Sequence, residues 1–230
     1  MTHQNKRSTR RIARAKRKLY TRIITIGMII VALVGVTWLV MNNLKSRTTG
    51  EDVGVLPELV GTKQYSSAPP MLIDITKQYL AKVKMARGGE FSIELYPDKA
   101  PITVNSFVFL ARQGYFDGVT FHRVLEGFMA QGGDPTGSGS GGPGYSFVNE
   151  ANVLTFEKAG VVAMANAGRD TNGSQFFIMF GPYGLSESDY TIFGQVISGM
   201  DVVNGITRRD PNTNPEFSGD MIESITITEK

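Results

Sequence analysis

The sequence predicts a mainly β fold, a closed antiparallel barrel with two α-helices, preceded by one transmembrane helix. Three observations support this. Short strand-like patterns follow one another closely over residues 71–230, and only two stretches there have helical spacing. Most of the 26 glycines lie in the second half of the chain, which indicates many tight turns. Residues 23–41 form an apolar run without a charge.

The apolar run at 23–41, IITIGMIIVALVGVTWLVM, is long enough to cross a bilayer as a helix. At ~1.5 Å per residue it rises about 28 Å, close to the ~30 Å hydrocarbon thickness. Trp38 near its end suits an interfacial position. A cleaved signal peptide and a buried core helix are the alternatives. A signal peptide usually has a shorter apolar region and an Ala-x-Ala site, neither of which is found here.

Basic residues are distributed unevenly around this run. Residues 1–22 hold nine Lys/Arg and no acidic residue, whereas Lys45 and Arg47 follow the run closely. The asymmetry predicts a basic cytoplasmic tail over 1–22, a single-pass anchor in the lipid bilayer, and an extracytoplasmic location for the rest. A nuclear address or a nucleic-acid-binding arm is the alternative for the tail. Because the tail stands directly beside an apolar run, a topology signal is the simpler interpretation of its charge.

Residues 42–70 have no sustained periodicity and end in Ser-Ser-Ala-Pro-Pro, so they are predicted to be a flexible linker. The folded domain is expected to begin near Met71 and to continue to Lys230. Within 71–230 there are 12 basic and 18 acidic residues, a net charge of −6. An acidic domain is a poor partner for nucleic acid, and we expect it to be monomeric.

The domain begins with strand-like alternation, in which Phe91, Ile93 and Leu95 alternate with polar residues after a Gly-Gly turn. A helix is predicted from Pro101 to Ala111, where apolar residues have helical spacing and proline occupies the start. The later patterns predict strands over 119–124, 160–166, 175–180, 190–197 and 222–228, and a short helix over 200–206.

Composition excludes several kinds of chemistry. The chain has no cysteine, and its two histidines are His3 and His122. Thiolate nucleophiles, disulfides and Cys-based metal sites are therefore excluded, and a zinc site or a Ser-His-Asp triad has one candidate imidazole in the domain. We expect no metal and no cofactor. The G-x-G-x-x-G spacing of Gly139, Gly141 and Gly144 lacks the strand and helix of a dinucleotide site.

Two motifs identify a family. The stretches FHRVLEGFMAQGGD at 121–134 and MANAGRDTNGSQFFI at 164–178 resemble the two conserved blocks of cyclophilin-type peptidyl-prolyl cis/trans isomerases. The resemblance extends over about 71–230. It implies an eight-stranded barrel capped by two helices, and an enzyme that accelerates rotation about X-Pro bonds in client proteins as a folding helper.

The resemblance also assigns roles to single residues. Arg123 matches the catalytic arginine of the family. The residues that match the proline pocket are Phe128, Met129, Phe177 and Leu185. Those that match the polar groups and groove around the peptide are Gln131, Ala165, Asn166, Ala167 and Gln175, and those at the side pocket are Thr136 and Gly139.

Two positions depart from the family pattern. Gly184 falls where the family often has a tryptophan, which weakens the expectation of tight cyclosporin binding. Tyr190 falls where a histidine is common, so an aromatic wall is retained while substrate preference could differ.

The proposed chemistry suits these residue types. Rotation about a peptide bond meets a barrier of ~18–20 kcal/mol from its partial double bond. A fixed guanidinium that donates to the pyramidal proline nitrogen would lower this barrier without any covalent step. A module that binds proline segments with little turnover is the main alternative. A hydrolase is the other, although no nucleophile and base are paired in the sequence.

Overall fold

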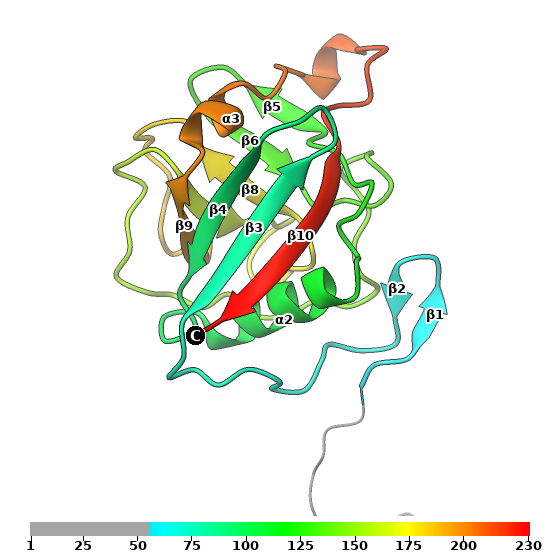
Figure 1. Cartoon of the computed structure of the whole chain (residues 1–230), viewed down its shortest axis with the longest axis vertical. Coiled ribbons are helices and arrows are strands. Elements are labelled where there is room, and N and C mark those ends of the chain that lie inside the picture. Colours follow the sequence, from blue (N-terminus) through cyan, green and yellow to red (C-terminus); the bar gives the residue numbers. More distant parts are fainter. Residues whose placement is uncertain (1–55) are drawn as a thin grey trace, which may run out of the picture. The chain divides into compact units, whose positions relative to one another are not determined.

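The structure is a computed structural model that describes residues 56–230, and an antiparallel sheet of eight strands dominates this part (Figure 1). Neighbouring strands follow the order β10-β3-β4-β9-β7-β8-β6-β5. The last strand along the chain thus pairs with the first strand of this sheet. The strands are β3 (Tyr79–Met85), β4 (Glu90–Leu95), β5 (Arg123–Leu125), β6 (Met129–Gly132), β7 (Val161–Met164), β8 (Phe176–Met179), β9 (Ile192–Ser198) and β10 (Ile222–Glu229).

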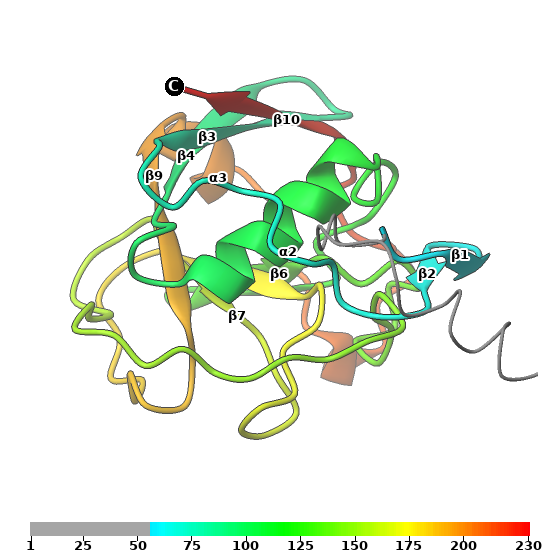
Figure 2. The ribbon, with the colours of Figure 1, turned by 90° about the horizontal axis from the view of Figure 1, so that it is seen from below.

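Two α-helices in the described part lie at opposite ends of the sheet, α2 (Pro101–Arg112) and α3 (Met200–Asn204) (Figures 1 and 2). Both occupy stretches that the sequence predicts to be helical. Because Ala100 at the start of α2 has no capping side chain, the distant Glu150 takes over that role. Its carboxylate accepts hydrogen bonds from the backbone N–H of Ile102 and of Thr103, at 2.9 and 2.8 Å. A 3₁₀ helix, η1, spans Pro211–Thr213.

The central strands are buried on both faces, which separates the apolar residues into two clusters. Along β8, Phe176 and Ile178 point into an inner cluster with α2, whereas Phe177 and Met179 point into an outer cluster. In the inner cluster Phe107 of α2 lies 5.3 Å from Phe193, measured between ring centroids. The outer cluster consists of Met129, Phe156, Val161, Ala163, Phe177, Met179 and Ile192.

The predicted closed barrel is an open half-barrel. In the described residues β5 and β10, the two edge strands, are not paired with each other by a ladder. Isolated bridges, Thr120 with Met221 and Val124 with Arg209, span part of the gap. The predicted strand 119–124 is reduced to β5, because the chain before Arg123 makes the single bridge of Thr120 in place of a regular ladder. The strands predicted at 160–166, 175–180, 190–197 and 222–228 are β7, β8, β9 and β10 with shifted ends.

Residues 56–70, predicted to be part of a flexible linker, are ordered against the domain. They contain a hairpin of β1 (Leu59–Gly61) and β2 (Gln64–Tyr65). The physical reason is Tyr65, whose side chain is buried in the inner cluster. The rest of the predicted linker, 42–55, lies outside the described residues.

The predicted basic tail (1–22) and transmembrane helix (23–41) also lie outside the described residues. Within 56–230, no helix combines the length and the apolar character that a bilayer crossing requires.

Candidate active site

A pocket of about 140 Å³ opens above the outer cluster, where β5, β6 and β8 lie side by side. Every described residue that lines it was predicted from the sequence. Arg123 comes from β5, Met129 and Gln131 from β6, and Phe177 from β8. The complete lining is Arg123, Phe128, Met129, Gln131, Ala165, Asn166, Phe177, Leu185 and Tyr190.

The floor of the pocket is apolar and closely packed. Met129 and Phe177 are 1% and 4% exposed, and both belong to the outer cluster. Phe177 is fixed from two sides, because Phe156 stacks at 6.0 Å and Tyr190 meets its ring edge-on at 5.6 Å. A floor held in this way can receive a small apolar ring without rearrangement.

Arg123 lies half-buried at the rim of the pocket. Its Nη1 donates to Oε1 of Gln131 at 3.3 Å, and its guanidinium carbon lies 5.8 Å from the centre of the Phe128 ring. Within residues 56–230, no carboxylate lies within salt-bridge distance of Arg123. Its charge is therefore oriented by neutral neighbours and directed to the pocket.

The adjacent His122 is buried, at 2% exposed, and lines neither the pocket nor the groove described below. Neither of its ring nitrogens has a hydrogen-bond partner among the described residues. Burial lowers the pKa of His122, and the nearby charges of Arg209 and Arg123 act in the same direction, against the opposing charge of Asp134. The imidazole is thus held in its neutral form.

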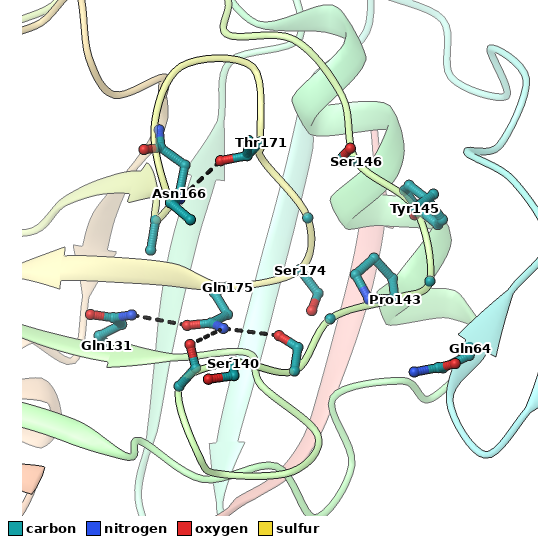
Figure 3. Close-up of a pocket in the computed structure, with 17 residues that line it drawn as sticks. Gln64, Gln131, Ser140, Pro143, Tyr145, Ser146, Asn166, Thr171, Ser174 and Gln175 are labelled. Atoms are coloured by element: carbon teal, nitrogen blue, oxygen red, sulfur yellow. Dashed lines mark hydrogen bonds between the residues drawn. The ribbon is translucent and has the colours of Figure 1, made fainter.

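Gln131 and Gln175 connect the pocket to the glycine-rich loop at 137–144 (Figure 3). Nε2 of Gln131 donates to Oε1 of Gln175 at 2.9 Å. Nε2 of Gln175 in turn donates to the carbonyl oxygens of Gly139 and Gly141, at 3.0 and 2.9 Å. Together with the bond from Arg123, these contacts form a continuous chain from the guanidinium to the loop backbone.

The glycine-rich loop is shaped by Asp134, a fully buried residue that sequence analysis did not single out. Its carboxylate accepts from the backbone N–H of Thr136, Gly139 and Gly141, at 2.7, 2.6 and 3.1 Å. Burial alone would raise the pKa of Asp134, but these hydrogen bonds and that from the Thr136 hydroxyl outweigh burial and lower it. A Cβ on Gly141 would lie 2.0 Å from the Asp134 carboxylate, so only glycine fits there.

A polar groove of about 670 Å³ runs beside the pocket, and Gln131, Ala165 and Asn166 line both cavities. None of the described residues that line the groove carries a charge. The predicted residues Ala167, Gln175 and Gly139 line the groove and not the pocket. Thr136 lines neither cavity, and its backbone N–H donates to the Asp134 carboxylate at the start of the loop. The remaining lining is Gln64, Ser140, Gly141, Gly142, Pro143, Gly144, Tyr145, Ser146, Thr171, Gly173 and Ser174.

Sequence analysis missed an aromatic ring next to the pocket. Tyr183 stacks on Phe128 with centroids 4.2 Å apart, and 48% of it is exposed. Tyr183 immediately precedes Gly184, which the resemblance was expected to place where the family often has a tryptophan. The aromatic residue beside Gly184 was the available signal. Asn166, predicted to contact peptide, donates through Nδ2 to the carbonyl of Asp189 at 2.8 Å and so braces the loop before Tyr190.

The combined arrangement can bind an apolar ring, direct one positive charge at its rim and hold a neutral chain alongside. Within residues 56–230 there is no cluster of three or more His, Asp or Glu side chains that could hold a metal ion.

Comparisons with known proteins agree with this geometry. The sequence model described as "Cyclophilin type peptidyl-prolyl cis-trans isomerase/CLD" matches residues 80–228. The chain is 50% identical over 130 residues to peptidyl-prolyl cis-trans isomerase-like 1 of Rhizopus delemar, covering 54% of this chain and 79% of the relative. It is 47% identical over 125 residues to peptidyl-prolyl cis-trans isomerase B of Bacillus subtilis, covering 54% and 87%.

Solved structures are similar as well. A cyclophilin type peptidyl-prolyl cis-trans isomerase of Cryptosporidium parvum matches with a TM-score of 0.60 at 29% identity, covering 67% of this chain and 99% of that one. The same protein, crystallised in the presence of the dipeptide Ala-Pro, matches with a TM-score of 0.59 at 29% identity, covering 66% and 99%.

Proposed function

The chain belongs to the cyclophilin-type peptidyl-prolyl cis-trans isomerases and is such an enzyme, and from this membership we propose how it acts and where. The substrates are X-Pro segments of extracytoplasmic proteins. The proline ring occupies the 140 Å³ pocket, and Arg123 stabilises the twisted amide. One observation supports this mechanism above the others. Among the described side chains, only Gln131 hydrogen-bonds to Arg123, and this bond orients the guanidinium at the rim of the pocket.

The proposed mechanism uses a difference in charge distribution between the ground state and the transition state. In the planar amide the proline nitrogen shares its lone pair with the carbonyl and is a poor acceptor. As the bond twists, the lone pair returns to nitrogen, which becomes able to accept a hydrogen bond from the Arg123 guanidinium. Because the donor is already in place, the interaction strengthens in the transition state and lowers the barrier.

The remaining side chains keep one part of the substrate fixed while the other part turns. The floor of Met129 and Phe177 holds the ring, and the polar groove beside it binds the adjoining chain. No bond is made or broken in the substrate, so the reaction needs positioning and electrostatics alone.

The mechanism is tested by comparing the full-length wild-type chain in detergent with Arg123→Ala and Arg123→Lys. We expect the rate of X-Pro exchange, measured by NMR on a short peptide, to fall tenfold or more in Arg123→Ala. This corresponds to at least ~1.4 kcal/mol of transition-state stabilisation. Lysine should restore part of the rate, because it retains the charge without the planar donor.

Arg112→Ala is the matched control, since Arg112 lies on α2 and pairs with Glu229 away from the pocket. It should retain the wild-type rate. An Arg123→Ala variant that exchanges the peptide as fast as Arg112→Ala would refute the role of Arg123. Wild-type protein that binds the peptide without accelerating exchange would favour the alternative of a binding module.

The location is the second part of the proposal. We place residues 1–22 in the cytoplasm, the anchor at 23–41 in the bilayer and the isomerase domain on the extracytoplasmic side. Support comes from the nine basic residues before the anchor and the uncharged length of the anchor itself.

Because the chain has no cysteine, single introduced cysteines report on topology without background. In intact cells, a membrane-impermeant maleimide should label Glu216→Cys in the domain and leave Thr2→Cys unlabelled until detergent is added. Labelling of Thr2→Cys from outside would reverse the orientation. Loss of an N-terminal epitope from the mature chain would replace the anchor with a cleaved signal peptide.

A further inference from the structure

The hairpin of β1 and β2 lies before the residues that match the family, 80–228, yet it is built into the domain. Tyr65 is 7% exposed, and its ring meets Phe109 of α2 edge-on at 5.0 Å. Lys63 precedes it in the left-handed conformation at φ 56°, and its Nζ donates to the carbonyl of Asp117 at 2.5 Å. The hairpin is therefore fixed by an aromatic anchor in β2 and by a hydrogen bond from its turn.

The hairpin is also bonded directly to the glycine-rich loop. The backbone N–H of Tyr65 donates to the carbonyl of Pro143 at 2.7 Å. At Gly144, which adopts φ 90°, a Cβ would lie 2.6 Å from the Tyr65 carbonyl oxygen. Glycine is thus required for the loop and the hairpin to approach so closely.

This contact places Gln64, which is exposed, on the wall of the polar groove. Figure 3 shows its side chain extending from β2 toward the groove, on the far side of Pro143 from Gln175. The described lining of the groove carries no charge, so the groove offers hydrogen bonds and no ionic preference. The residue at position 64 is therefore able to set a charge preference by itself.

We propose that Gln64 determines specificity for the client residues that flank the proline, and that the hairpin forms the outer wall of their binding groove. The inference rests on the proposed function, in that the occupant is the client chain continuing from the proline pocket. The groove and the pocket share Gln131, Ala165 and Asn166, so a chain seated in one passes into the other. The specificity of this enzyme is then set in part by a segment outside its family-defining residues.

The test introduces a charge at position 64 and measures whether the affinity for charged peptides changes. Full-length Gln64→Lys and Gln64→Glu are compared with wild type on peptides built around Ala-Pro, with Glu or Lys placed in turn at each of three positions on either side. The ratio of the Kd values for the Glu and Lys peptides is measured by fluorescence anisotropy, and exchange is measured in parallel by NMR.

We expect the charge at residue 64 to matter at one position of the peptide, or at two adjacent ones. There Gln64→Lys should bind the Glu peptide about threefold more tightly than the Lys peptide, and Gln64→Glu should show the reverse preference, as for a solvent-accessible ion pair. Both preferences should vanish in 1 M salt. Wild type should discriminate little between the two peptides.

Thr62→Lys and Thr62→Glu are the matched controls, because Thr62 is exposed on the same hairpin but does not line the groove. They should leave every ratio as in wild type. Unchanged ratios in both Gln64 variants would overturn the inference, and so would equal shifts in the Thr62 variants. The Kd ratios do not depend on turnover, so the two proposals can fail separately. A wild-type protein that fails to accelerate exchange would refute the proposed function, and the Kd ratios would still decide the role of Gln64.

Discussion

The pocket and the polar groove share three residues, but they are built in opposite ways. The pocket takes its floor, Met129 and Phe177, from strands, and this floor is part of the outer cluster. The groove is made largely of loop backbone, which Asp134 holds from within and the hairpin holds from outside. The same enzyme thus contains a surface fixed by packing beside a surface fixed by hydrogen bonds.

The difference indicates a division of labour. A packed floor suits a ligand of constant shape, and the proline ring is such a ligand. An open groove lined by glycines and uncharged polar side chains suits a variable chain, because it makes no demand for one particular client side chain. Changes in the pocket should therefore affect stability and catalysis together, whereas changes in the groove should separate them.

The largest effect is expected at the floor of the pocket. Phe177→Ala removes a ring that is 4% exposed and packed against Phe156 and Tyr190. We expect the free energy of unfolding to fall by about 3–5 kcal/mol, as for other buried Phe-to-Ala changes. Urea unfolding of the variant measures this loss. Phe177→Leu is the milder control, and a loss below ~1 kcal/mol in Phe177→Ala would show that the pocket is not part of the core.

Asp134→Ala should break the groove and leave the pocket floor intact. The change removes the carboxylate that accepts from the part-buried N–H groups of Gly139 and Gly141, and we expect the free energy of unfolding to fall by about 1–3 kcal/mol. Unfolding and amide hydrogen exchange of the loop are the measurements. Asp134→Asn, which keeps one oxygen acceptor, should lose less. Equal exchange protection of the loop in wild type and Asp134→Ala would contradict the role of Asp134.

Acid should weaken the region around His122, which lies under the glycine-rich loop. The pKa of His122 is lowered in the folded state, so the unfolded state binds more protons as the pH falls below ~6.5. The free energy of unfolding is therefore highest above pH ~6.5 and falls as the pH drops from there toward the pKa of His122 in the folded state. For one proton this fall is at most ~1.4 kcal/mol per pH unit.

Urea unfolding between pH 7.5 and 5 measures this slope. His122→Leu should flatten it, because Leu does not titrate and none of the described residues hydrogen-bonds to the ring it replaces. The carboxylate of Asp134 does not interfere, because its lowered pKa keeps it charged throughout this range. An equally steep slope in His122→Leu would assign the acid sensitivity to other groups.

The smallest effect is expected from Tyr183, at the outer edge of the pocket. Stacked aromatic pairs contribute about 0.5–1.5 kcal/mol, and Tyr183 is half exposed. Tyr183→Ala should weaken binding of an Ala-Pro peptide about threefold, as measured by anisotropy, with little change in unfolding. Tyr183→Phe keeps the ring and should bind as wild type does, so weaker binding in that variant would point to the hydroxyl instead.

The same comparison explains what could be predicted from the sequence. Most pocket residues stand in the two motifs at 121–134 and 164–178, and the resemblance extends beyond them to Leu185 and Tyr190, so it located all of the lining. The groove depends on loop geometry and on partners far apart in sequence. Asp134 is the last residue of the first motif, but the resemblance assigned it no role, and Gln64 lies outside both motifs.

The fold was predictable to a similar degree. The helix α2 has clear periodicity and a proline start, and its prediction is confirmed. In contrast, β3 was not predicted, although Ala81, Val83 and Met85 are buried in alternation with the outward Lys82 and Lys84. The hairpin strands are two and three residues long, too short for any periodicity, and the opening of the barrel follows from pairing that no local pattern contains.

The pairing of β10 with β3 has a consequence for biosynthesis. The ladder joins residues such as Ile225 and Val83, at opposite ends of the domain's chain, and it uses the last strand of the domain to leave the ribosome. Until they emerge, β3 is an unprotected edge, and the domain cannot complete its sheet. A nascent chain truncated before Ile222 would therefore expose a strand edge that favours aggregation until β10 has emerged to cover it.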